Sequence, residues 1–391
     1  MHKNKLTRRD FLKLASATTA GLTLSACAVK ATELPTTIPT FMPTPSLTAT
    51  ATPIPTNTST PTPKPPESLR DFAEVLDIKI GTLIDGTARF WENIKWQEVA
   101  KREFNLGVIT PLWHVVIPKK DTFDFSWPDL QIGFAQSAGM TVHAESLVMS
   151  LFTPQWLKEG RFTREQLLDM YQKYCRRIVT HYKGKVSSWS AVIEAGFTPP
   201  YDSTDFWFHS LGKDYVDMAC EIIREEEPST PIIYGDSGNF TQNGAKYKHT
   251  KNIIEHLKEK KLVDAVGIEI DWDAAKIPPS KEELVATMQS YGVPVYITEI
   301  VVNLRNVGGP DEERFQRQAE LYRLIIEASL ESRLCKQLTF WGFGDKYSFA
   351  EQKEFQGSPK ADATLFDDNL EPKPAYFAAL DVLKRFYNEK Q

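Results

Sequence analysis

The residues from Leu69 onward predict a single (β/α)8 barrel. Short β-branched runs alternate there with longer stretches of helical period, which is typical of β/α units around a parallel sheet. Eight such runs fit into about 320 residues, a length that suits one barrel better than two domains. A doubly wound open sheet is the alternative, but no GxGxxG or P-loop pattern follows the first run to support it.

The eight predicted strands combine β-branched and other apolar residues and are bounded by turn-forming residues. They are Ile78–Ile84, Leu106–Pro111, Thr141–Met149, Ser188–Ile193, Pro231–Tyr234, Val263–Ile268, Pro294–Thr298 and Gln337–Trp341.

Helix start signals lie between these runs. "TREQ" is a capping box that opens a predicted helix over Thr163–His181, and "SKEE" opens another at Ser280. A third helix is predicted over Asp311–Leu330 from its apolar periodicity. Its expected buried face carries Phe315, Ala319, Tyr322 and Ile326.

The first 26 residues predict an export signal. "TRRDFLK" (Thr7–Lys13) matches the twin-arginine pattern, and the apolar run Leu14–Leu24 that follows is too short to span a membrane. "LSAC" (Leu24–Cys27) resembles the bacterial lipoprotein box, in which cleavage precedes the Cys and its thiol carries the lipid. We therefore expect an exported protein that is anchored to the cell surface only through a lipid on Cys27. An ordinary cleaved signal, with Cys27 there by chance, is the alternative.

Residues 27–68 predict a disordered linker. Thr32–Pro66 is composed mainly of Thr, Pro and Ser, holds ten of the chain's 25 prolines, and carries only Glu33 and Lys64 as charges. Such a segment cannot bury enough apolar surface to offset its ordering entropy, and its prolines favour extended conformations. We expect it to hold the domain at 69–391 away from the membrane.

Charge and cysteine content restrict the partners. The formal net charge is −5, and removal of residues 1–26, which carry a net +4, leaves −9. An acidic body argues against nucleic acid as a partner. Cys175, Cys220 and Cys335 are widely spaced without a CxxC or His partner, so we expect buried thiols. We expect no metal, no cofactor and a monomer.

Acidic residues gather at the predicted carboxyl ends of the strands, where barrel enzymes place their active sites. Glu194 and Glu299 each directly follow an apolar run, which favours catalysis over a structural ion pair. Two carboxylates across a cleft with aromatic walls are what glycoside hydrolysis requires. The other residues expected near this rim are Glu145, Asp236, Glu269, Asp271, Trp341 and Asp345.

Several segments resemble the glycoside hydrolase family 10 endo-β-1,4-xylanases. The most specific are "LTFWGFGDKYSF" (Leu338–Phe349) and "LFDDNLEPKPAYFAAL" (Leu365–Leu380), and "FDFSWPDLQIGFAQSAGM" (Phe123–Met140) also fits. "VYITEI" resembles the family's nucleophile strand and "WSAVIEA" its acid/base segment. The resemblance therefore implies a retaining hydrolase of a β-linked polysaccharide, with Glu299 as nucleophile and Glu194 as acid/base.

The departures from the family pattern fall on residues that would bind the sugar. "PLWHVV" (Pro111–Val116), "HAESLVMS" (His143–Ser150) and "GIEIDW" (Gly267–Trp272) replace family segments that carry Asn, Lys, Gln and His side chains. Ile193 stands where the family has an Asn that holds the sugar's 2-hydroxyl. We therefore expect altered specificity, and a catalytically retired carbohydrate-binding surface lipoprotein is the alternative.

Six residues are the expected substrate contacts. An acidic pair on the sixth strand could select a cationic substrate such as an amino sugar, although a structural ion pair with a basic residue is the simpler interpretation. Trp side chains could stack on sugar rings. The contacts are Trp341, Glu269, Asp271, Glu145, Trp113 and Asp345, with Trp156 and Trp272 as further aromatic candidates.

Overall fold

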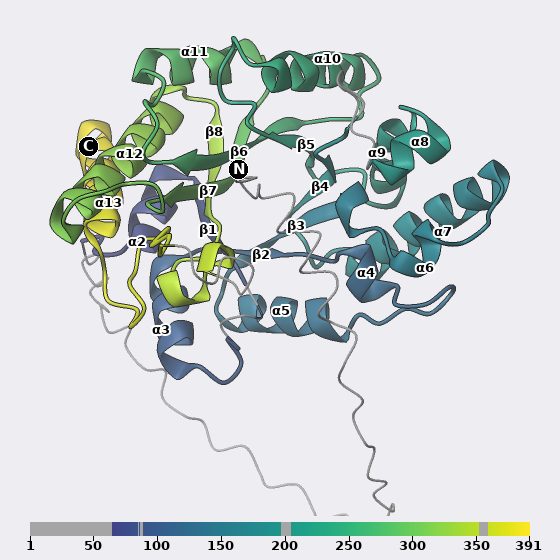
Figure 1. Cartoon of the computed structure of the whole chain (residues 1–391), viewed down its shortest axis with the longest axis horizontal. Helices are drawn as coiled ribbons and strands as arrows, with labels where there is room; N and C mark the ends of the chain where they lie inside the picture. The colour runs from purple at the N-terminus through teal and green to yellow at the C-terminus, as the bar shows by residue number, and fades with distance from the viewer. Residues whose placement is uncertain (1–64, 85, 87–88, 197–204, 352–358) are drawn as a thin grey trace, which may run out of the picture.

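A computed structural model describes residues 65–84, 86, 89–196, 205–351 and 359–391. Its eight strands are parallel and pair in chain order, and β8 pairs with β1 to close the barrel. Helices surround the strands (Figure 1). The predicted (β/α)8 barrel is confirmed. The expected leader, linker and lipid-bearing Cys27 lie mostly or wholly outside the described residues, so those expectations stay predictions.

The strands agree with the sequence-based prediction in number and order. They are β1 (Lys79–Leu83), β2 (Leu106–Ile109), β3 (Thr141–Val148), β4 (Ser188–Ile193), β5 (Ile232–Ser237), β6 (Ala265–Asp273), β7 (Val295–Asn303) and β8 (Cys335–Phe340).

β5, β6 and β7 extend several residues beyond the ends that the sequence predicts. The β6–β7 ladder continues through the pairs Glu269↔Glu299 and Asp271↔Val301 to Asp273↔Asn303. Glu269, Asp271 and Glu299 therefore lie within strands rather than after them, as does Asp236 in β5. Charged residues at the mouth of a barrel do not end a strand, because the parallel hydrogen-bond ladder needs only the backbone.

The helices cover the outside of the barrel. They are α2 (Leu69–Leu76), α3 (Ile94–Glu103), α4 (Trp113–Val116), α5 (Ser126–Ser137), α6 (Gln155–Lys158), α7 (Arg164–Tyr182), α8 (Phe206–Leu211), α9 (Tyr215–Glu226), α10 (Ala245–Glu259), α11 (Lys281–Ser290), α12 (Asp311–Glu331) and α13 (Pro374–Lys390). None of those in the described part of the chain combines the length and apolar composition needed to cross a membrane.

Both predicted capping boxes are present. The Thr163 side chain accepts a hydrogen bond from the backbone of Gln166 at the start of α7, and Ser280 does the same with Glu283 at the start of α11. A cap of this kind contributes about 1 kcal/mol by satisfying a backbone N–H that the helix leaves unpaired. On α12, three of the four residues predicted to face the core are buried, and Phe315 is half-buried.

The main hydrophobic core lies between the barrel and its helices, and the three cysteines of the described residues are buried free thiols, as predicted. The barrel contains polar side chains as well. His143 of β3 is fully buried, and its ring nitrogens lie 2.8 Å from the Ser188 hydroxyl and 3.0 Å from the Ser190 hydroxyl. Burial lowers the pKa of His143 to about 3, so the ring is neutral at ordinary pH.

Asp345 has a structural role, and its expected contact with substrate stays a prediction. Its carboxylate is buried after β8, where it accepts hydrogen bonds from the backbone and hydroxyl of Thr364, each at 2.9 Å, and from Lys373 Nζ at 2.9 Å. Lys373 is itself buried and also donates to the Asp362 carbonyl at 2.7 Å. The Asp345–Lys373 pair therefore links the segment before α13 to the segment after β8.

Lys373→Met should lower the free energy of unfolding by about 3–5 kcal/mol, because it leaves the buried Asp345 carboxylate without its cation. Urea unfolding followed by circular dichroism measures the change. Lys360→Met is the matched control, since Lys360 pairs with Asp368 at the surface and its loss should cost less than about 1 kcal/mol. Equal effects for the two variants would contradict a structural role for the buried pair.

Candidate active site

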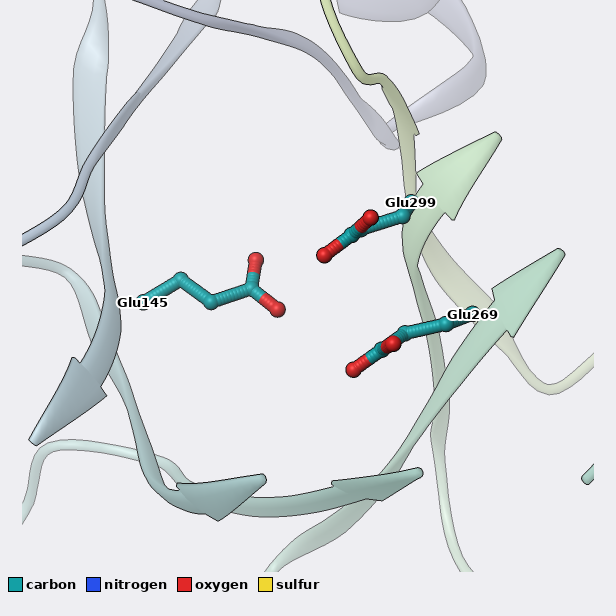
Figure 2. A group of neighbouring side chains, drawn as sticks. All are labelled: Glu145, Glu269 and Glu299. Atoms are coloured by element: carbon teal, nitrogen blue, oxygen red, sulfur yellow. The ribbon is translucent and has the colours of Figure 1, made fainter. Parts of the chain in front are cut away.

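Three carboxylates meet inside the mouth of the barrel. Glu145 of β3, Glu269 of β6 and Glu299 of β7 point toward one another (Figure 2), and one oxygen from each lies within 4.8 Å of the others. All three side chains are at most 2% exposed. We refer to these three residues as the acidic cluster.

The register of the strands creates the acidic cluster. Glu269 and Glu299 are directly paired residues of neighbouring strands, which puts their side chains on the same side of the sheet. Glu145 reaches them from β3, three strands away from β6 around the barrel, and approaches through the interior. The sequence predicts that Glu145, Glu269 and Glu299 each lie near the carboxyl ends of the strands. Nothing in the sequence indicates that Glu145 lies close to the other two.

Close carboxylates in a buried site repel one another, so the acidic cluster is expected to hold a proton or a cation. One oxygen from each residue could ligate a hard cation, and the expectation that no metal binds stays a prediction. His143 does not supply the positive charge. Its Nε2 lies 3.8 Å from Glu145, but burial keeps the ring neutral.

Glu194 lies directly after β4 and has an uncommon backbone conformation. Its φ is +53°, in the left-handed region that non-glycine residues rarely occupy, while its N–H donates to the Gly235 carbonyl of β5 at 3.1 Å. The side chain is half-buried. Such backbone strain concentrates at functional sites, where the surrounding structure holds it in place, and this supports a functional role for Glu194.

The wall next to Glu194 is apolar. Ile193 is 4% exposed and packs with Met149 and Phe152, and Leu112 and Leu151 pack against these three. This apolar cluster is separate from the main core and comes from the carboxyl ends of β2, β3 and β4. The side chains of these five residues offer no hydrogen-bond donor to a sugar hydroxyl.

Two of the predicted substrate contacts are in accessible positions. Trp341 is half-buried directly after β8, where it packs against two small apolar clusters, one of Leu83, Leu106 and Val108 and one that includes Val301. Asp271 of β6 is half-buried, two residues beyond Glu269 on the same strand. Their roles in binding stay predictions.

Trp113 packs in the core, and its expected contact with a sugar stays a prediction. It is 3% exposed, its indole N–H donates to the Leu147 carbonyl at 2.7 Å, and its ring packs edge-on against Trp207 at 5.1 Å. Aromatic rings of α7 contact it from another side. The sequence could not distinguish this core Trp from one that faces a ligand, because it lies in the short helix α4 just after β2.

Trp156 and Trp272, the further aromatic candidates, are both half-buried. Trp156 donates its N–H to the Ile117 carbonyl at 3.0 Å. Trp272 packs against Phe240 with ring centres 5.5 Å apart. Each therefore already has a partner within the protein, Trp156 from α6 and Trp272 from β6.

A charged residue that the sequence did not single out lies beside the site. Lys246, in the first turn of α10, bonds the buried carboxylate of Asp236 at 2.9 Å and is attracted electrostatically to Glu194 and Glu269. The ion pair expected for Glu269 or Asp271 with a basic residue of the following loop stays a prediction.

Carboxylates converging at the carboxyl ends of the strands of a (β/α)8 barrel are the arrangement that enzymatic glycoside hydrolysis requires. The class of protein that this fold and site define is a glycoside hydrolase. Residues 68–382 match the model of glycosyl hydrolase family 10, and the chain belongs to that family.

The similarity to known proteins covers most of the chain. Endo-1,4-beta-xylanase B of Thermotoga neapolitana is 32% identical over 332 residues, which are 82% of this chain and 93% of that protein. Xylanase 10B of Thermotoga petrophila, solved in complex with xylobiose, is 31% identical with a TM-score of 0.76, covering 83% of this chain and all of that one. Native xylanase 10B of Thermotoga maritima gives a TM-score of 0.75 at 31% identity, with 83% of this chain and all of that chain covered.

Proposed function

We propose that the domain is a retaining β-glycoside hydrolase that acts on xylan or a related β-linked polysaccharide, with Glu299 as nucleophile and Glu194 as acid/base. The observation that carries the proposal is the position of these two carboxylates at the mouth of the barrel, one in strained backbone after β4 and one in the acidic cluster on β7. The xylanase names of the relatives support the substrate class.

The reaction would run in two displacements. The Glu299 carboxylate bonds to the anomeric carbon as the bond from that carbon to the leaving oxygen breaks, and Glu194 gives its proton to that oxygen. Glu194 then takes a proton from water while the water oxygen bonds to the anomeric carbon, which releases Glu299. The first displacement therefore requires a protonated Glu194 and an ionised Glu299.

Glu299→Gln should abolish sugar release, because the amide cannot form the glycosyl-enzyme. Glu194→Gln should lower release from polysaccharide by about 10²–10⁴-fold, the contribution of a positioned general acid. With an aryl glycoside, whose leaving group needs no proton, Glu194→Gln should form the glycosyl-enzyme rapidly and hydrolyse it slowly. Reducing-sugar release from xylan, mixed-linkage glucan, mannan and chitosan identifies the substrate, and burst kinetics with the aryl glycoside separate the two steps.

The matched control for both variants is Glu98→Gln, which changes an exposed carboxylate on α3. It should behave as the unchanged protein. Activity of Glu299→Gln equal to that of the unchanged protein would rule out the assigned nucleophile.

The apolar cluster supports altered specificity. The resemblance implies that the family's Asn at the position of Ile193 holds a sugar hydroxyl, an interaction that strengthens in the transition state. Ile193 cannot make that bond and instead packs with Met149 and Phe152. The same observation favours the second candidate function, a carbohydrate-binding protein that no longer catalyses, which would bind a glycan in the panel above without releasing sugar.

Ile193→Asn should raise kcat/KM on xylan by about tenfold or more, because a hydrogen bond to a substrate hydroxyl discriminates by at least that factor. Initial rates on xylan and on a xylo-oligosaccharide measure the effect. Ile193→Leu is the matched control, since Leu has nearly the shape of Asn but no amide, and it should give no gain. A gain of the same size with Leu would point to relieved packing instead of a restored hydrogen bond.

We also propose, from the leader motif alone, that the protein is exported and anchored to the cell surface by a lipid on Cys27. Cys27→Ser should move the protein from the membrane fraction to the medium or the soluble extracytoplasmic fraction, because the thiol that carries the lipid is gone. Immunoblots of the fractions measure this. Retention of Cys27→Ser in the membrane would contradict the lipid anchor.

A further inference from the structure

The peptide group between Ala195 and Gly196, close behind Glu194, is held at both of its polar atoms. The Ala195 carbonyl accepts a hydrogen bond from His249 Nε2 at 2.9 Å, and the Gly196 N–H donates to Asp205 Oδ2 at 2.6 Å. Because a carbonyl only accepts, Nε2 is the ring nitrogen that carries the proton. We refer to these two contacts, from His249 and from Asp205, as the peptide clamp.

The backbone on the other side of Glu194 is fixed as well. The Glu194 N–H donates to the Gly235 carbonyl of β5 at 3.1 Å. Between this bond and the peptide clamp, Glu194 has a φ of +53°, which a residue with a side chain adopts only when its surroundings enforce it. The contacts on both sides therefore set the direction in which the Glu194 side chain leaves the backbone.

Asp205 is itself rigidly held. It is 2% exposed, and its Oδ1 accepts from the Phe208 N–H at 2.9 Å, which caps α8. The Ser150 hydroxyl, just after β3, donates to the same oxygen, and the Tyr215 hydroxyl of α9 donates to Oδ2 at 3.0 Å. Asp205 therefore ties the peptide behind Glu194 to three separate elements of the fold.

His249 is the other half of the peptide clamp. It lies on α10 and is 6% exposed. Burial lowers the pKa of His249, so at neutral pH the ring has a single N–H, which is the one donated to Ala195. The Asp236 carboxylate is 3.9 Å from the same nitrogen, beyond hydrogen-bond range. The ring is therefore oriented toward the Ala195 carbonyl.

Resting on the role proposed above for Glu194, we propose that Asp205 and His249 are positioning residues that hold Glu194 in its left-handed conformation and so direct its carboxyl group at the leaving oxygen. A general acid acts only within hydrogen-bond reach of the atom that it protonates. Release of the peptide clamp would let the Glu194 backbone relax and carry the carboxyl group away. Proton transfer would then be lost while Glu299 keeps its place on β7.

Two variants open the peptide clamp from opposite ends. Asp205→Ser keeps one oxygen, which can cap α8, but leaves the Gly196 N–H without its acceptor. His249→Phe keeps a flat ring and removes the N–H, whereas His249→Gln returns a donor near the position of Nε2 and should recover the activity that Phe loses.

The matched control is Glu227→Gln. Glu227 is buried and accepts hydrogen bonds from the Trp189 indole and from the Gly184 N–H, each at 2.7 Å, near the amino end of β4. Like Asp205, it is a buried carboxylate with a backbone donor, but it lies away from Glu194. Any loss of activity in Glu227→Gln should be the same for all substrates.

Aryl glycosides of the sugar that the panel above identifies separate positioning from general damage. With a phenyl glycoside, whose leaving group needs a proton, kcat/KM of Asp205→Ser and His249→Phe should fall about 10–100-fold. With a dinitrophenyl glycoside, which leaves without a proton, kcat/KM should stay within about twofold while kcat and KM fall together, because water attacks slowly without its base. Azide needs no base and should restore kcat. Equal losses of kcat/KM on the two glycosides would mean a purely structural role and overturn the proposal.

A second measurement does not depend on catalysis. Labelling the whole chain with carbonyl carbon-13 alanine and nitrogen-15 glycine restricts an HNCO NMR spectrum to Ala–Gly peptide groups, of which the sequence has two besides 195–196, at 20–21 and 138–139. The Gly196 amide proton should move upfield in Asp205→Ser, and the Ala195 carbonyl carbon should move upfield in His249→Phe, because each loses its hydrogen bond. Unmoved signals in both variants would overturn the proposal. Moved signals in a protein that releases no sugar would uphold the peptide clamp while the proposed hydrolase activity fails.

Discussion

Closure of the parallel ladder from β1 through β8 is the constraint on which the rest of the molecule depends. Each strand donates and accepts backbone hydrogen bonds on both edges, so the eight carboxyl ends must meet around one mouth. The continued pairing of β6 with β7 holds Glu269 and Glu299 side by side, and the barrel diameter lets Glu145 reach them from β3. Three carboxyl groups are thereby brought close together among buried side chains.

The charged and titratable groups near the acidic cluster differ in how they are held. His143 is kept neutral between two serine hydroxyls and adds no charge of its own. Lys246 of α10 bonds the buried carboxylate of Asp236 at 2.9 Å. Charge at the mouth is therefore set by elements as distant in the chain as β3 and α10.

The part of the barrel mouth beside Glu194 is apolar. Ile193, Met149 and Phe152 form a small apolar cluster beside Glu194, where the resemblance to family 10 implies polar sugar contacts. Under the proposed function, the catalytic carboxylates lie next to an apolar wall, and this arrangement is what the proposed change of specificity would require. The fold is shared with the Thermotoga xylanases at a TM-score near 0.76, so differences in substrate would arise from side chains at the mouth and not from the barrel itself.

The sequence by itself determined the barrel, the order of its strands, the capping boxes of α7 and α11, and the candidates Glu194 and Glu299. These features are local, because periodicity, helix caps and short motifs can be recognised within a few residues of sequence. Only the tertiary structure decided that Glu145 joins Glu269 and Glu299, that Lys246 bonds Asp236, and that Trp113 and Asp345 are buried. Strand register and barrel closure bring together residues more than a hundred positions apart, and a buried Trp or Asp has the same local sequence signal as one that faces a ligand.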